Sequence, residues 1–154
     1  MIKLVAYEEK YHEALEALLT EFSTEVFGVG TSNIDHFVSG HWCIYLALKG
    51  EDVIGFTSFI YNNYYGLRTP TVGNDYAYIQ PQYRGGKTMY LFTIQAGAVS
   101  LEYNLPLETY FATEDGMKLS TLAEGELMYQ AYTYDVEAVR SKFDKLTHKF
   151  EIKK

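Results

Sequence analysis

The octapeptide from Pro81 to Thr88, PQYRGGKT, holds the residues whose types and spacing suggest phosphate chemistry. It ends in Gly-Lys-Thr, the triplet that closes a nucleoside triphosphate loop of the Walker type. Such a loop also needs a glycine five positions before the glycine of the triplet, and that position holds Pro81. Proline has a fixed φ and no N–H, so it cannot begin the wrap of backbone amides around phosphates. These residues therefore argue against a triphosphate loop.

The double glycine Gly85-Gly86 suggests an anion site of another kind. The preceding residues 75–80, DYAYIQ, are typical of a strand. The following residues 89–103 contain no proline, and their spacing predicts a helix with an apolar stripe at Leu91, Ile94, Ala98 and Leu101. A loop between a strand and a helix presents backbone N–H groups at the helix N-terminus, and these bind anions.

Other elements of the N-terminal half must position this loop. Residues 2–6 read as a strand, and the next sixteen residues predict a helix with one apolar face formed by Tyr11, Leu15, Leu18, Leu19 and Phe22. Thr31 or Ser32 is the predicted cap of a short second helix. Two β-rich runs, 44–48 and 53–61, are joined by a compact turn at Gly50 and predict a hairpin.

The C-terminal half continues the alternation of strands and helices. Residues 107–113 predict a fifth strand, and residues 115–124 predict a short helix. Residues 126–136 alternate polar and apolar side chains and predict one long strand, followed by a polar helix to the end of the sequence. The order of elements predicts one mixed sheet with helices on its faces.

The composition of the sequence indicates which classes of binding partner to expect. The 154 residues carry a net charge of −7, which argues against a nucleic-acid surface and favours a cationic substrate. A single cysteine, Cys43, excludes an internal disulfide, and four histidines without paired spacing predict no structural metal. The first residues include acidic side chains and no long apolar run. We therefore expect no signal peptide, no membrane partner and a cytoplasmic location.

The stretch DYAYIQPQYRGGKTMYLF resembles the central motif of the GNAT family of N-acetyltransferases. In that family a strand ends in a pattern like Val-x-Pro-x-Tyr-Arg-Gly, and a Gln/Arg-x-x-Gly-x-Gly/Ala loop opens a long helix. The resemblance covers most of the chain, because the order of elements is also that of the family. It implies a single acyltransferase domain over residues 1–154, with a mixed, mostly antiparallel central sheet. The double glycine is similar to that of phage-borne members.

The resemblance implies acetyl-CoA as the cofactor, with its pyrophosphate bound by the loop. A backbone N–H near Tyr78 or Ile79 would polarise the thioester carbonyl. The residues that the resemblance assigns to the cofactor are Tyr78, Ile79, Gln82, Tyr83, Arg84, Gly85, Gly86, Lys87 and Thr88. Lys87 stands where the family has its final Gly or Ala, and its ammonium either pairs with a phosphate or faces solvent.

Acidic and aromatic residues are candidates for the acceptor side. Asp75 is the predicted catalytic base, because related enzymes often carry an acidic residue on this strand; the alternative is a strand-start aspartate after a turn. Tyr61 and Tyr64 either cradle an ammonium group or pack their rings on the sheet. Glu114 either attracts a cationic acceptor or caps the next helix.

One departure from the family pattern leaves two functions open. Family members use a tyrosine to protonate the departing thiolate, and its position here, aligned on Gly125, holds Thr121. The first function is an acetyl-CoA-dependent N-acetyltransferase acting on a primary amine of a small molecule or protein, in a fold that often forms homodimers. The second is an inactive protein of this fold that serves as a binding or structural component. Without that acid, acetyl transfer needs another donor, a water molecule or a thiolate that leaves unaided. The candidates for another donor are Tyr110, Tyr129, Tyr132 and Tyr134.

Overall fold

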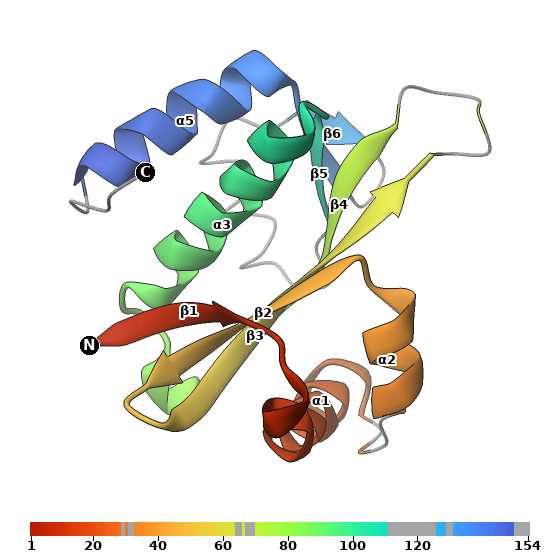
Figure 1. Cartoon of the computed structure of the whole chain (residues 1–154), viewed down its shortest axis with the longest axis vertical. Helices are drawn as coiled ribbons and strands as arrows, with labels where there is room; N and C mark the ends of the chain where they lie inside the picture. Colours follow the sequence, from red (N-terminus) through yellow and green to blue (C-terminus); the bar gives the residue numbers. More distant parts are fainter. Residues whose placement is uncertain are drawn as a thin grey trace. The chain divides into compact units, whose positions relative to one another are not determined.

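The computed structural model describes residues 1–28, 30, 33–63, 66, 70–110, 126–128 and 131–149 (Figure 1). The chain divides into two compact units. The N-terminal unit comprises Met1–Ile60 and Tyr76–Met89, and the C-terminal unit comprises Tyr61–Asp75 and Tyr90–Lys154. Strand β4 (Thr71–Ile79) therefore contributes residues to both units.

The strands of the N-terminal unit follow the order β1, β2, β3, β4. The first three are β1 (Ile2–Ala6), β2 (Cys43–Lys49) and β3 (Asp52–Asn62). Strand β2 pairs antiparallel with both β1 and β3. The turn between β2 and β3 contains Gly50, whose φ of +62° lies in the left-handed region that glycine adopts without strain. The predicted hairpin is therefore confirmed.

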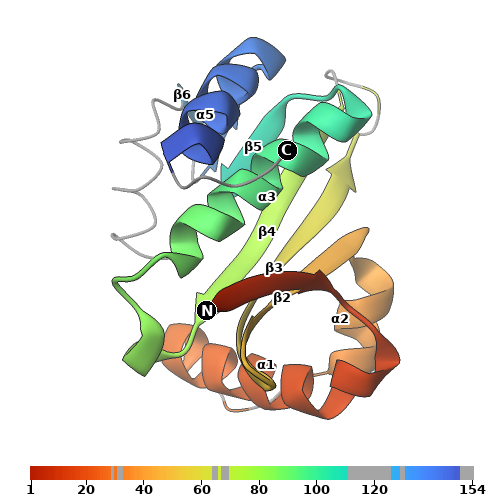
Figure 2. The ribbon, with the colours of Figure 1, turned by 60° about the vertical axis from the view of Figure 1, so that its left-hand side comes forward.

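Two helices of the N-terminal unit cover one face of these strands (Figure 2). They are α1 (His12–Phe27), which follows the short 3-10 helix η1 (Glu9–Tyr11), and α2 (Ile34–Gly40). Four of the five residues of the predicted stripe are buried in α1, whereas Tyr11 lies in η1 and is partly buried. These residues pack with α2 and the strands in a core of Leu15, Leu18, Leu19, Phe22, Ile34, Phe37, Ile44, Leu46, Leu48, Phe56 and Tyr78.

The cap of α2 differs from the sequence prediction. The side chain of Asn33 accepts a hydrogen bond from the backbone N–H of His36 at 3.1 Å, so Asn33 is the N-cap. The prediction of Thr31 or Ser32 was therefore wrong by one or two residues. Asparagine, serine and threonine are all good caps, and a run of them does not show where the helix begins.

Gly55 allows β3 to approach the end of β4 closely. A Cβ atom at this position would lie 2.5 Å from the carbonyl oxygen of Tyr78 and 3.3 Å from the Cα atom of Ile79. Just beyond, the N–H of Gln80 donates to the carbonyl oxygen of Ile54 at 2.9 Å. The backbone at the end of β4 therefore lies in direct contact with its neighbouring strand β3.

We expect Gly55→Ala to lower the free energy of unfolding by about 2–3 kcal/mol, because the added methyl group meets backbone that cannot rotate away. Urea unfolding followed by circular dichroism measures this change. Gly40→Ala is the matched control, since a Cβ there meets no atom within 4 Å. Equal stability of the two variants would contradict the close packing of β3 on β4.

The strands of the C-terminal unit follow the order β4, β5, β7, β6. They are the first half of β4, then β5 (Leu107–Tyr110), β6 (Glu126–Met128) and β7 (Ala131–Tyr134). Strands β4 and β5 pair in parallel, whereas β7 pairs antiparallel with both β5 and β6. With the antiparallel pairs of the N-terminal unit, this arrangement confirms the predicted mixed, mostly antiparallel fold class.

Helix α3 (Thr88–Tyr103) belongs to the C-terminal unit from Tyr90 onward, and there it lies beside α5 (Val136–Lys149) (Figures 1 and 2). A Cβ atom on Gly97 of α3 would lie 3.1 Å from the ring of Phe143 on α5, so glycine lets the ring approach the helix. The stripe predicted for α3 is mostly wrong, because only its Ile94 is buried and the other three residues are half-buried. The helix buries a different face, formed by Phe92, Ala96, Val99 and Ser100.

The long strand predicted for residues 126–136 is wrong. Strands β6 and β7 pair with each other, with Glu126 opposite Thr133 and Met128 opposite Ala131. Alternation of polar and apolar side chains continues through both strands, and no glycine or proline separates them. The pattern therefore could not reveal the reversal of the chain. The short helix predicted for residues 115–124 lies outside the described residues.

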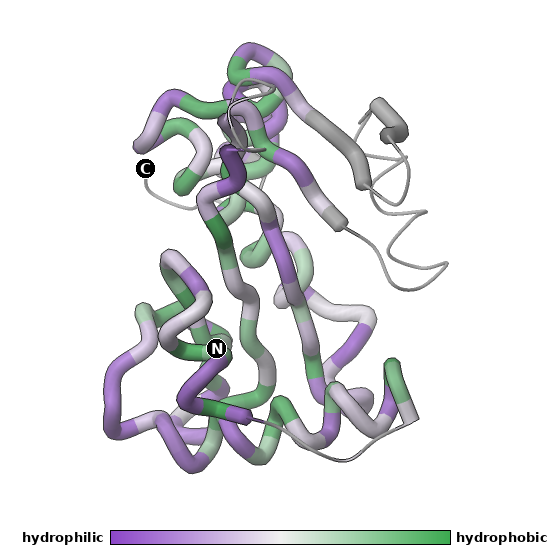
Figure 3. Tube along the Cα trace, turned by 90° about the vertical axis from the view of Figure 1, so that its right-hand side faces the viewer, coloured by the Kyte–Doolittle hydropathy of each residue, from purple (hydrophilic) through white to green (hydrophobic). Residues whose placement is uncertain are grey.

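Within the described residues, no helix combines the length and the apolar character needed to cross a membrane. Hydrophilic segments interrupt the hydrophobic ones along the trace (Figure 3).

Candidate cofactor loop

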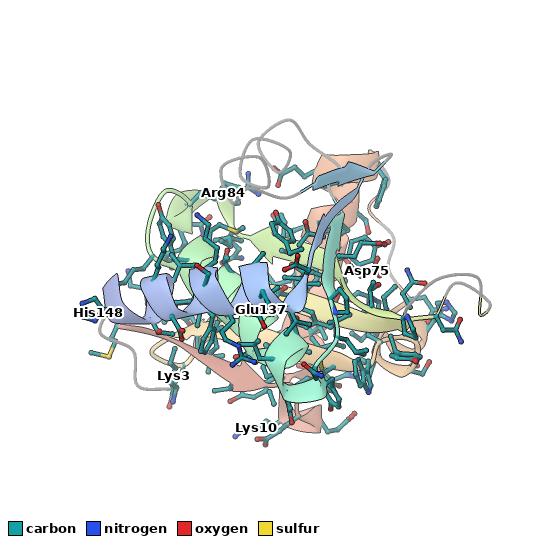
Figure 4. The ribbon with its side chains drawn as sticks, turned by 90° about the horizontal axis from the view of Figure 1, so that it is seen from above. Lys3, Lys10, Asp75, Arg84, Glu137 and His148 are labelled. Atoms are coloured by element: carbon teal, nitrogen blue, oxygen red, sulfur yellow. The ribbon has the colours of Figure 1, made fainter. Side chains whose placement is uncertain are left out.

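The loop that carries PQYRGGKT lies in the N-terminal unit and joins β4 to α3 (Figure 2). Figure 4 labels its Arg84. Pro81 begins a 3-10 helix, η3 (Pro81–Tyr83), where its missing N–H costs nothing because the first amides of a helix lack intrahelical partners. The N–H of Tyr83 then donates to the carbonyl oxygen of Gln80 at 2.9 Å. The chain thus makes a tight turn directly after the strand.

Gly85 and Gly86 open the backbone toward α3. Gly85 has a φ of +84°, and a Cβ atom on either glycine would meet no atom within 4 Å. Helix α3 begins two residues later and runs for 16 residues. Its first N–H groups have no partner within the helix, and the helix dipole places partial positive charge there. This geometry suits an anion that approaches the backbone closely.

Thr88, the first residue of α3, carries a buried hydroxyl. Its side chain is 1% exposed, and its Oγ1 atom has no hydrogen-bond partner among the described residues. A buried hydroxyl without a partner is unfavourable by about 1–3 kcal/mol. The start of α3 therefore combines amides that lack intrahelical partners with a buried hydroxyl that has no partner among the described residues.

Arg84 is bound by a residue that the sequence reasoning missed. Its two terminal nitrogens donate to the two carboxylate oxygens of Glu25 on α1, each at 2.7 Å. Its Nε donates to the carbonyl oxygen of Ile79 at 2.8 Å, and its guanidinium carbon lies 5.4 Å from the centre of the Tyr78 ring. Hydrogen bonding to Arg84 holds the pKa of Glu25 below its ordinary value.

Glu21 of α1 binds the other end of the loop. Its carboxylate accepts hydrogen bonds from the Tyr78 hydroxyl at 3.3 Å and from the Gln80 side chain at 3.1 and 3.3 Å. Burial, with the nearby charges of Glu21 and Glu25, raises the pKa of Tyr78 to about 12. Tyr78 therefore stays protonated at neutral pH and donates to Glu21.

The remaining residues predicted to bind the cofactor differ in exposure. Tyr78 and Ile79 have buried side chains, so only their backbone could face a ligand. Gln82 and Lys87 are exposed. Tyr83 is half-buried, and the ammonium of Lys49 lies 5.2 Å from the centre of its ring.

The residues predicted for the acceptor side fall outside the loop. Asp75 is half-buried in the interior of β4, which begins four residues earlier, so it is not a strand-start residue. Tyr61 is 50% exposed near the end of β3. Tyr64 and Glu114 lie outside the described residues. No cluster of three potential metal ligands occurs in the part of the chain that the structure describes.

No protein-family model and no curated protein matches the sequence, but solved structures do. An acetyltransferase of the GNAT family from Staphylococcus aureus Mu50 matches with a TM-score of 0.70 at 11% identity, over 88% of this chain and 99% of that one. Ribosomal-protein-alanine N-acetyltransferase from Brucella melitensis biovar Abortus 2308 matches with a TM-score of 0.67 at 14% identity, over 85% of this chain and 96% of that one. AtaTR bound with acetyl-CoA matches with a TM-score of 0.67 at 12% identity, over 92% of this chain and 98% of that one.

These neighbours correct one prediction and confirm another. KacTA and the AtaT–AtaR complex have been solved bound to DNA. Excluding a nucleic-acid partner was therefore wrong, because proteins of this fold occur in complexes with DNA. The exclusion rested on net charge, which averages over the whole chain and does not describe a single surface. The predicted fold is confirmed: the chain has the fold of the GNAT acetyltransferases.

Proposed function

We propose that the chain is an N-acetyltransferase that moves the acetyl group of acetyl-CoA to a primary amine of a small molecule or protein. The observation that carries the proposal is the Gly85-Gly86 turn at the start of α3, on a fold that its neighbours use for acetyl transfer. A neighbour solved with acetyl-CoA supports the choice of cofactor.

The loop residues fit a pyrophosphate. The amides from Gly85 to Thr88 are the donors that we assign to the phosphate oxygens, and Lys87 adds a positive charge. The glycines leave open space over these amides, and Thr88 contributes a buried hydroxyl without a partner among the described residues. When bound, acetyl-CoA supplies the acetyl group as a thioester. The backbone near Tyr78 and Ile79 is the donor that we assign to the thioester carbonyl.

Asp75 is the residue that we assign to deprotonation of the acceptor. An ammonium group has no lone pair, so a base must remove a proton before the nitrogen can attack a carbonyl carbon. The half-buried position of Asp75 within β4 supports this role over that of a turn residue. Because a negative protein attracts cations, the net charge of −7 also favours an ammonium-bearing acceptor.

The donor that protonates the leaving thiolate is not assigned to one residue. Tyr134 is buried, with 7% of its side chain exposed, and Tyr129 lies outside the described residues. The alternative of an inactive binding or structural component therefore stays open. A homodimer, a cytoplasmic location, one domain over the whole chain and a likeness to phage-borne members stay predictions.

Calorimetric titration of the purified protein with acetyl-CoA tests the proposal, with ATP and Mg²⁺ as the parallel control. We expect a dissociation constant between about 1 μM and 1 mM for acetyl-CoA, the range of typical substrate affinities, and no heat with ATP. Binding of ATP alone would return the loop to the triphosphate class. If acetyl-CoA binds but a panel of amines yields no acetylated product, the inactive alternative is favoured.

A further inference from the structure

We propose that Glu21 and Glu25 form a clamp, here called the α1 clamp, that sets the shape of the cofactor loop. In this arrangement Arg84 is a positioning residue that serves the clamp and does not contact phosphate. The inference rests on the proposed function, because acetyl-CoA is taken as the ligand of the loop. The geometry of the clamp is that of the protein without cofactor.

The contacts of Arg84 fix its guanidinium on three sides. Both terminal nitrogens donate to Glu25 at 2.7 Å, and Nε donates to the carbonyl oxygen of Ile79 at 2.8 Å. The group also lies over the ring of Tyr78. Two parallel N–H to oxygen bonds are the geometry that arginine and carboxylate form best. Moving the guanidinium to a phosphate would break these bonds together.

The two glutamates are four residues apart, so they lie on the same face of α1. Like charges at this spacing are unfavourable by a few tenths of a kcal/mol unless other groups compensate. Here Glu21 receives donors from Tyr78 and Gln80, before η3, and Glu25 receives Arg84, after η3. One helix face thus holds the loop on both sides of its 3-10 turn.

The clamp also determines which basic side chain of the loop can contact a bound phosphate. Arg84 and Lys87 are the basic residues of the loop, and Glu25 neutralises Arg84. Lys87, exposed one residue before α3, is then the side-chain cation for phosphate. Removing Glu25 has two opposed effects on the affinity for acetyl-CoA. Loss of a negative charge near the anion site favours binding, whereas release of Arg84 loosens the loop and weakens binding. Salt screens the first effect, whereas the second changes the conformation of the amides themselves.

A double-mutant cycle separates these roles. We expect Glu25→Ala and Arg84→Ala each to weaken acetyl-CoA binding about threefold to fivefold, as befits a partly exposed ion pair. The double variant should bind no more weakly than either single variant, because both changes break one contact. Glu16→Ala is the control, since it removes an exposed carboxylate from the same helix. Unchanged or tighter binding by Glu25→Ala, with a large loss in Arg84→Ala, would make Arg84 a phosphate ligand and overturn the clamp.

Hydrogen exchange in the cofactor-free protein tests the clamp without the proposed function. Glu25→Ala should speed exchange of the Tyr83 and Arg84 amides, which donate to the carbonyl oxygens of Gln80 and Pro81. It should leave the amides of β1 and β2 unchanged, whereas Glu16→Ala should change neither set. If wild type binds no acetyl-CoA, the proposed function fails and this comparison still decides the clamp. Equal exchange rates in Glu25→Ala and wild type would refute it.

Discussion

We expect Gly85→Glu to weaken acetyl-CoA binding at least about 100-fold, equivalent to about 2.7 kcal/mol, while the protein remains folded. A Cβ atom on residue 85 would meet no atom within 4 Å, so the new side chain begins in open space. Its carboxylate would, however, stand among the amides that receive phosphate, where it adds bulk and a like charge. The φ of +84° adds backbone strain of about 1–2 kcal/mol for any residue other than glycine.

Two controls separate charge from strain in this experiment. Gly85→Gln has the same bulk and backbone strain without the charge, and it should bind more tightly than Gly85→Glu. Gly66→Glu places the same charge at another glycine with open space and a φ of +78°. It should bind acetyl-CoA as wild type does. Wild-type affinity in Gly85→Glu, measured by calorimetry, would remove the loop from the cofactor site.

The second large effect concerns Asp75. We expect Asp75→Asn to lower kcat about 100-fold, the lower end of the contribution of a general base, with little change in acetyl-CoA affinity. The amide keeps the shape of the carboxylate but cannot accept a proton at neutral pH. The loss should be greatest at low pH, where the smallest fraction of the acceptor amine is already neutral.

Steady-state rates across pH with a fixed amine acceptor measure this effect. Asp52→Asn is the matched control, because Asp52 is an exposed aspartate at the start of β3. It removes the same charge and should retain the wild-type rate. A wild-type pH profile in Asp75→Asn would show that Asp75 is not the base.

Local patterns were sufficient to predict the elements around the loop. The hairpin at Gly50, the buried face of α1 and the strand-loop-helix arrangement at Gly85 each depend on residues close together in the sequence. The boundaries were less certain where several residues could serve the same role, as with Asn33 at the start of α2. The residues of β6 and β7 were predicted as strand, but the reversal of the chain between them was missed because the alternation continues across it.

The α1 clamp could not be predicted in this way. Arg84 and Glu25 are 59 positions apart, as are Gln80 and Glu21. In the sequence, Glu21 and Glu25 look like solvated residues on the polar face of an amphipathic helix. Only the folded arrangement of α1 against the end of β4 reveals their partners. A pair of acidic residues four apart, with an arginine in a distant loop, is the only signal that the sequence contains.

The anchoring of the loop limits how it can be transplanted into other proteins. The amide of Gln80, just before the loop, donates to the carbonyl oxygen of Ile54 on β3, and Glu25 of α1 binds Arg84 in the loop. A synthetic peptide covering Tyr78 to Tyr90 lacks both anchors, so we expect it not to hold the Gly85-Gly86 turn. Engineers who graft this loop onto another scaffold must therefore import parts of three segments that are distant in sequence.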